Sequence, residues 1–179
     1  SLKYRLDFAQ NIWKERPEMS MEPVFSLEDE YTGEKIGSKL ERVREVMKEN
    51  GCNAHVLSSL DDIAWLLNIR GNDIAYCPLV LSYAIVYNNS VELFADIRKF
   101  SDDIINLLAE NQVKIYPYED IYRKVSEMTS EDKLLLDSAI MNYSLYQAIS
   151  KETVIVDKQN PEILMKSVKN ETQAENLRK

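Results

Sequence analysis

Short apolar runs alternate along the chain with amphipathic stretches of about ten residues, and this alternation predicts a layered α/β domain. The Asn88-Asn89 pair lies between two apolar runs and is typical of a hairpin turn. We therefore expect a mixed sheet of about six strands, flanked by helices. The expected strands are 54–58, 82–87, 91–95, 113–116, 133–137 and 153–156, and the expected helices are 38–50, 59–68, 102–111, 118–128 and 142–150.

Small polar residues and glycine mark the ends of two expected helices. Ser38 is followed three residues later by Glu41, which is the pattern of a capping box at a helix start. Gly51 is placed to end that helix. Ser101 is the expected N-cap of helix 102–111.

The start of the chain has a helical pattern that prolines then interrupt. Phe8 and Ile12 lie at helical spacing, as do Ala9 and Trp13. Prolines at positions 17 and 23 break the chain after them. We therefore expect a helix near the start, followed by a linker.

The other end of the chain changes pattern after position 161. No further strand is expected there, and residues 170–179 are polar and helix-prone. Three apolar residues, Ile163, Leu164 and Val168, are expected to face the domain.

Composition narrows the class of protein. The chain has 179 residues, 45% hydrophobic and 29% charged, which suits one globular domain of ordinary size. Its net charge of -8 opposes nucleic acid as the main partner. No apolar run approaches the roughly 20 residues of a membrane helix, and no signal peptide is visible, so we expect a cytoplasmic protein without a membrane partner.

The cysteine and histidine content argues against a zinc site and against a redox motif. Cys52 and Cys77 form no CxxC pair, and two buried free thiols are expected. His55 is the only histidine and lies in an expected strand, so we interpret it as a core or edge residue. No nucleophile elbow, dinucleotide motif or P-loop is present.

An acidic pair, Asp61 and Asp62, follows the first expected strand. Paired carboxylates at this place are compatible with a magnesium site. They are also typical of a helix N-terminus, where acids offset the helix macrodipole. This second interpretation is favoured, because no third carboxylate or suitably spaced lysine accompanies them.

A polar break with an arginine lies between two apolar runs. Arg70 is followed by Gly71, Asn72 and Asp73. Its guanidinium could bind a carboxylate in a bidentate way, or form a structural salt bridge to Asp61, Asp62 or Asp73. Trp65 lies on the preceding expected helix, where a core position is favoured over a site position.

Four segments, in chain order, resemble three-domain aminopeptidase P, the Xaa-Pro aminopeptidases of the creatinase/prolidase superfamily. The most specific is SSLDDIAWLLNIRGNDIAYCPLVLSYAIV at 58–86, through Asp61, Asp62, Trp65, Asn68, Arg70, Gly71 and Tyr83. The others are IWKERPEM at 12–19, EYTG at 30–33 and PEILMKSVKNETQAENLR at 161–178.

The resemblance implies a fold like the creatinase/prolidase N-terminal domain and a division into three parts. Residues 1–24 would be the end of a preceding domain and a linker. Residues 25–160 would be the α/β domain. Residues 161–179 would be a linker and the start of the first helix of a catalytic domain.

The resemblance also implies an activity for the parent protein, a hydrolase that removes an N-terminal residue preceding proline. Enzymes of the family are metallopeptidases and use two metal ions, usually manganese, held by two Asp, one His and two Glu of the catalytic domain. None of these ligands matches a position here, and His55 matches no ligand position. We therefore expect no catalytic residue, metal ligand or cofactor in this chain, and no peptidase activity of the chain alone.

Two functional hypotheses remain. In the first, this is the second domain of an aminopeptidase P, which shapes substrate access and contacts its own catalytic domain in a full-length homodimer acting on proline-containing peptides. Trp65, Arg70 and Asp73 are then the candidates for a substrate-cleft or domain contact. The alternative is a stand-alone interaction module without peptidase activity.

Overall fold

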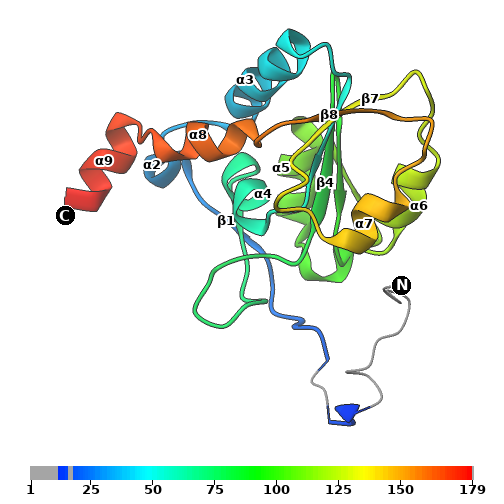
Figure 1. Ribbon diagram of the computed structural model, residues 1–179. Coiled ribbons are helices and arrows are strands. Elements are labelled where there is room, and N and C mark those ends of the chain that lie inside the picture. The colour runs from blue at the N-terminus through cyan, green and yellow to red at the C-terminus, as the bar shows by residue number, and fades with distance from the viewer. Residues whose placement is uncertain (1–11, 16–17, 179) are drawn as a thin grey trace.

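The computed structural model describes residues 12–15 and 18–178, and its centre is a six-stranded sheet (Figure 1). The helix expected around Phe8 and Ala9 lies outside the described residues. The strand order is β6-β5-β4-β2-β7-β8. The strands are β2 (Ala54–Leu57), β4 (Tyr83–Tyr87), β5 (Val91–Phe94), β6 (Val113–Tyr116), β7 (Lys133–Leu136) and β8 (Val154–Asp157).

The sheet is mixed, as the sequence predicts. Strand β4 pairs antiparallel with both β2 and β5, whereas the pairs β2/β7, β5/β6 and β7/β8 are parallel. The β4–β5 hairpin turns at Asn88-Asn89, where the Tyr87 amide donates to the Ser90 carbonyl at 2.8 Å. The expected hairpin is therefore confirmed.

Helices cover both faces of the sheet (Figure 1). Side chains alternate along the central strands, so that Ala84 and Val86 of β4 join one core cluster, while Tyr83 and Ile85 join the other. Helices α3, α4 and α5 pack on the first face, and α6 and α7 on the second. Their bounds are α3 (Ile36–Glu49), α4 (Leu60–Leu66), α5 (Asp102–Glu110), α6 (Asp120–Ser126) and α7 (Tyr143–Ala148), with a 3-10 turn η1 (Ile97–Lys99) before α5.

The predicted helix ends are partly right. Ser101 caps α5 by accepting a hydrogen bond from the Ile104 amide, and Gly51 takes the left-handed conformation after α3, with φ +66°. The capping box at Ser38 is wrong, because α3 begins at Ile36. Ile36 is buried in the core, so tertiary packing extends the helix upstream, and the Ser38 hydroxyl instead donates to Glu34.

A second, two-stranded sheet lies beside the first and was not expected. Strand β1 (Phe25–Ser26) pairs antiparallel with β3 (Ile69–Arg70). Helix α4 therefore ends at Leu66, before the expected end at position 68, and Asn68 has φ +52° in the turn that comes next. The short helix α2 (Asp29–Thr32) comes after β1.

Two helices complete the described chain, α8 (Pro161–Ser167) and α9 (Glu171–Arg178). Helix α8 packs against α3 and α4, and α9 against α2. The helical prediction for 170–179 is confirmed, but the expected facing of Leu164 and Val168 is wrong, since both are 69% exposed. The buried residue of α8 is Glu162, whose polar partner lies on the sheet.

The two cysteines also differ from each other. Cys52 is buried, as expected, whereas Cys77 is exposed, so the prediction of two buried thiols is wrong. Cys77 lies in the loop after Arg70, which carries a local bridge between Ile74 and Cys77. No helix in the described part of the chain is both long and apolar enough to cross a membrane.

Candidate functional site

A cavity of about 660 Å³ lies where α2, α4, β3, α8 and α9 meet, and we call it the α8–α9 cavity. Two of the three candidate residues from the sequence, Trp65 and Arg70, line it. Its other walls come from segments far away in sequence, including Tyr31 of α2, Lys166 of α8 and Leu177 of α9.

Trp65 is half-buried and has two kinds of neighbour. Part of its side chain packs against the core cluster, and the ring also borders the cavity. The Lys39 ammonium lies 4.7 Å from the ring centroid and the Arg42 guanidinium 5.9 Å from it. Both distances suit cation–π attraction, so the favoured core interpretation describes only one side of this residue.

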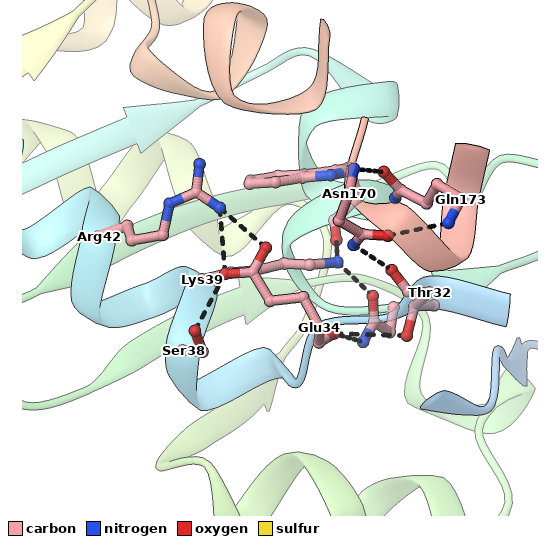
Figure 2. A network of polar contacts seen from close by, with 9 residues as sticks. Thr32, Glu34, Ser38, Lys39, Arg42, Asn170 and Gln173 are labelled. Carbon is pink, nitrogen blue, oxygen red and sulfur yellow. Dashed lines mark hydrogen bonds and ion pairs between the residues drawn. The ribbon is translucent and has the colours of Figure 1, made fainter. Parts of the chain in front are cut away.

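Lys39 is the centre of a buried polar network that holds the Trp65 region in place (Figure 2). Its ammonium donates to the Trp65 carbonyl at 2.7 Å and to Asn68 Oδ1 at 2.5 Å, and Asn68 Nδ2 donates to the Glu34 carbonyl at 3.0 Å. Burial lowers the pKa of Lys39 to about 8, although the Glu34 carboxylate acts in the opposite direction.

The same region fastens the start of α9 (Figure 2). Asn170 Oδ1 accepts from the Gln173 amide at 2.9 Å, and Asn170 Nδ2 donates to the Thr32 carbonyl at 2.8 Å. A β-carbon at Gly33, which has φ +66°, would lie 2.6 Å from Asn170 Oδ1. Glycine is therefore needed at this position both for the backbone conformation and for the approach of α9.

Arg70 makes no salt bridge within the described part of the chain, so the expected pairing with Asp61, Asp62 or Asp73 is wrong. Its Nη1 donates to the Ala64 carbonyl at 2.6 Å and to the Ile69 carbonyl at 2.8 Å. Burial lowers the pKa of the Arg70 guanidinium. The lysines that pair with the three acids, Lys166 and Lys99, lie far from them in the sequence.

Asp73 lies apart from the other two candidates. Its buried carboxylate pairs with the buried ammonium of Lys99 and accepts from the Leu81 amide at 2.7 Å. Asp73 is not among the residues that line the α8–α9 cavity. It ties the two ends of the 73–81 loop together, and the structure does not bring it next to Trp65 and Arg70.

Asp61 and Asp62 lie in the first turn of α4, as the helix-terminus interpretation predicts. The ammonium of Lys166, on α8, contacts both carboxylates, and Asp62 also accepts from Asn160 Nδ2 at 3.0 Å. Partial burial acts to raise the pKa of Asp61, but hydrogen bonds from Lys166 and Ser59 lower it overall. The lysine that balances the pair is thus supplied by α8.

His55 is fully buried on β2, which confirms its interpretation as a core residue. Its Nδ1 lies 3.0 Å from the Leu135 carbonyl, and its Nε2 lies 3.2 Å from Oε2 of Glu162, which is also fully buried. Burial alone would lower the pKa of His55, but the charge and hydrogen bond of Glu162, with smaller contributions from Leu135 and Asp62, raise it above its ordinary value.

Four charged residues of these networks were missed by sequence reasoning: Lys39, Lys99, Glu162 and Lys166. The sequence does contain a signal that Lys39 is buried: it lies four residues before Val43, and therefore on the apolar face of α3. Among the described residues, no group of three or more His, Cys, Asp or Glu side chains could hold a metal ion. The polar and aromatic groups that line the cavity include the guanidinium of Arg70, the ammonium of Lys166 and the indole of Trp65, which are groups suited to recognition.

Comparison with known proteins agrees with this fold. Residues 15–173 match the family model of the creatinase/prolidase N-terminal domain. The chain is 36% identical to a probable Xaa-Pro aminopeptidase P of Sordaria macrospora, over 94% of the chain and 29% of that protein. It is 34% identical to Xaa-Pro aminopeptidase 1 of Dictyostelium discoideum, over 92% of the chain and 26% of that protein.

Solved structures show the same relationship. The X-prolyl aminopeptidase of Caenorhabditis elegans, described as a cytosolic enzyme with a di-nuclear active site, superposes with a TM-score of 0.89 at 31% identity. The superposition covers 96% of this chain and 29% of that protein. The chain thus spans less than a third of the length of these three aminopeptidases. It belongs to the creatinase/prolidase N-terminal domain family.

Proposed function

We propose that this chain is a non-catalytic, N-terminal-type domain of a cytoplasmic, metal-dependent Xaa-Pro aminopeptidase. The observation that carries the proposal is the match of over nine-tenths of the chain to less than a third of Xaa-Pro aminopeptidases. In this proposal a catalytic domain comes after residue 179 and holds two manganese or similar divalent ions. The full-length protein is a homodimer that removes the N-terminal residue of peptides with proline in second position.

The role of the domain is to position the catalytic domain and to shape the approach of the peptide. Three contacts between distant segments support this role, because they fasten α8 to β2 and α4, and the start of α9 to α2. Glu162 of α8 binds buried His55, Lys166 of α8 bridges Asp61 and Asp62, and Asn170 binds the Thr32 carbonyl. A helix held by buried polar contacts has a defined direction, so it can fix the orientation of a domain attached to its far end.

The test uses the full-length gene product. We expect the residues beyond Lys179 to contain a metal-binding set of two Asp, one His and two Glu. We also expect the purified full-length protein to hydrolyse an Xaa-Pro peptide in the presence of manganese, and to lose this activity on chelation. A downstream sequence without such a set, or a full-length protein that does not turn over the peptide, would favour the stand-alone interaction module instead.

A further inference from the structure

Arg70 lines the α8–α9 cavity and has hydrogen-bond donors that are not in use. Both hydrogen bonds of Arg70 use Nη1, so Nη2 and Nε have no partner in the part of the chain that the structure describes. Nη2 and Nε are not among the buried side-chain atoms that lack a hydrogen-bond partner. The Arg70 side chain lines the cavity. The planar fork of a guanidinium presents two adjacent N–H donors that match the two oxygens of a carboxylate.

The charges around Arg70 are mostly positive. Lys166 and Lys169 line the same cavity, and Asp61 is the one carboxylate among its described lining residues. Lys166 is shared by Asp61 and by buried Asp62, so the positive excess comes from Arg70 and Lys169. The Lys169 ammonium donates to the Lys166 carbonyl and pairs with no carboxylate of the described residues. The cavity is therefore a basic site on a chain whose net charge is -8, and it is complementary to an acidic group.

The walls of the cavity are apolar and open. Leu177 is 74% exposed and Tyr31 is 56% exposed, and Ile163 and Trp65 line the space between them. Helix α9 has no buried residue, and Leu164 and Val168 of α8 are exposed nearby in sequence. Clustered exposed apolar side chains mark interaction sites, and arginine and aromatic residues are enriched in protein interfaces.

We propose that this cavity docks an acidic side chain of the catalytic domain, with Arg70 binding its carboxylate and Lys169 adding to the attraction. This rests on the proposed function. The occupant follows from position, because Leu177 of α9 lines the cavity, so a polypeptide that continues from α9 starts at the rim. The size of the cavity, about 660 Å³, is enough for a few side chains of such a partner.

The test compares hydrogen exchange in α8 and α9 between the full-length protein and the 179-residue chain. We expect slower exchange of residues 161–178 in the full-length protein, because the docked domain covers them. The variant Lys169→Glu should accelerate this exchange about tenfold in the full-length protein, as loss of a charge-assisted contact would do. The effect should be clearly smaller in the 179-residue chain, where the variant removes only the bond to the Lys166 carbonyl.

Two further variants make the result specific. Arg70→Gln should accelerate exchange more in the full-length protein than in the 179-residue chain, where it removes only the bonds to Ala64 and Ile69. Lys151→Glu has the same charge change at an exposed position outside the cavity and should have no effect in either protein. Equal exchange of 161–178 in the two proteins, or equal effects of Arg70→Gln in both, would overturn the inference.

Two other outcomes separate this inference from the proposed function. Full-length protein that hydrolyses the Xaa-Pro peptide but leaves 161–178 unprotected contradicts the docking and not the function. Protection of the same residues by self-association of the 179-residue chain would identify a second copy as the occupant and would also overturn the inference.

Discussion

The buried charged side chains of this domain each have a partner on another segment of the chain. Lys39 binds the Trp65 carbonyl, His55 binds Glu162, and Lys99 binds Asp73. A buried charge without a partner is strongly destabilising, so each of these pairs restricts how the segments that carry it can be arranged. At the scale of single residues, these contacts position the region around Trp65 and the helix that leaves the sheet.

Lys39 gives the first prediction. In Lys39→Met, the Trp65 carbonyl and Asn68 Oδ1 lose their donor, so we expect a loss of about 1–3 kcal/mol in the free energy of unfolding. Lys48→Met, at an exposed position of the same helix, should change it by less than about 0.5 kcal/mol. Urea unfolding of the three proteins at pH 7 measures both effects, and equal stability of the two variants would contradict the role of Lys39.

The pKa of Lys39 adds a pH dependence to this comparison. The folded pKa of about 8 lies below the ordinary lysine value of 10.5, so the unfolded chain binds more protons between these values. The wild-type free energy of unfolding should therefore gain a contribution from Lys39 as pH rises from 8 to about 10. The difference between wild type and Lys39→Met should grow over this range, and a constant difference would show that the pKa is not lowered.

His55 gives a prediction of opposite sign at lower pH. Its folded pKa is raised by Glu162, with Asp62 also facing it, so its contribution to stability is full below the unfolded pKa of about 6.5 and is lost as pH rises through the folded pKa. Since His55 is the only histidine, thermal unfolding between about pH 6 and pH 7.5 reports on it. Glu162→Gln should flatten the slope, and an unchanged slope would contradict the pairing.

At the scale of elements, the approach of α9 to the turn after α2 depends on a glycine. Asn170 caps α9 and reaches the Thr32 carbonyl, and there is no space for a β-carbon at Gly33. The start of α9 is therefore set by the 32–34 turn as much as by its own sequence.

A pair of alanine substitutions isolates this contact. Gly33 and Gly51 both have φ +66°, but a β-carbon at Gly51 meets nothing within 4 Å. We expect Gly51→Ala to cost about 1 kcal/mol from backbone strain alone, and Gly33→Ala to cost more. Gly33→Ala should also speed hydrogen exchange in α9, whereas Gly51→Ala should not. Equal effects on α9 would mean that its docking does not depend on the space at Gly33.

The elements also show what a sequence can and cannot predict. The strands β2, β4 and β7 were predicted because short apolar runs suffice when both faces of a strand are buried. The start of α3 was not predicted correctly, because burial of Ile36 outweighs the local capping signal at Ser38. Strands of two residues such as β1 have too few positions for any periodicity to appear.

The candidate site could be predicted from the sequence to a smaller extent than the strands and helices. Trp65 and Arg70, two of the three candidates for a cleft or domain contact, both line the cavity, and their role stays a prediction. Glu162 and Lys166 were missed, because their partners His55 and Asp62 are more than a hundred positions away. The fold determines which residues pair over such separations, and their spacing in the sequence does not predict the pairing.

At the scale of the whole molecule, a mixed sheet carries two helices, α8 and α9, that lead away from it (Figure 1). Buried polar contacts fasten α8 to β2 and α4, and Asn170 fastens α9 to the turn after α2. The cavity between these helices has a basic floor and exposed apolar walls. In the proposed function, this arrangement positions a partner domain.

Turnover of an Xaa-Pro tripeptide by the purified 179-residue chain, with and without manganese, beside the full-length gene product, tests the proposed role most directly. We predict hydrolysis by the full-length protein with manganese and none by the 179-residue chain under either condition. Manganese-dependent release of the N-terminal residue by the 179-residue chain alone, abolished by a chelator, would contradict a non-catalytic role.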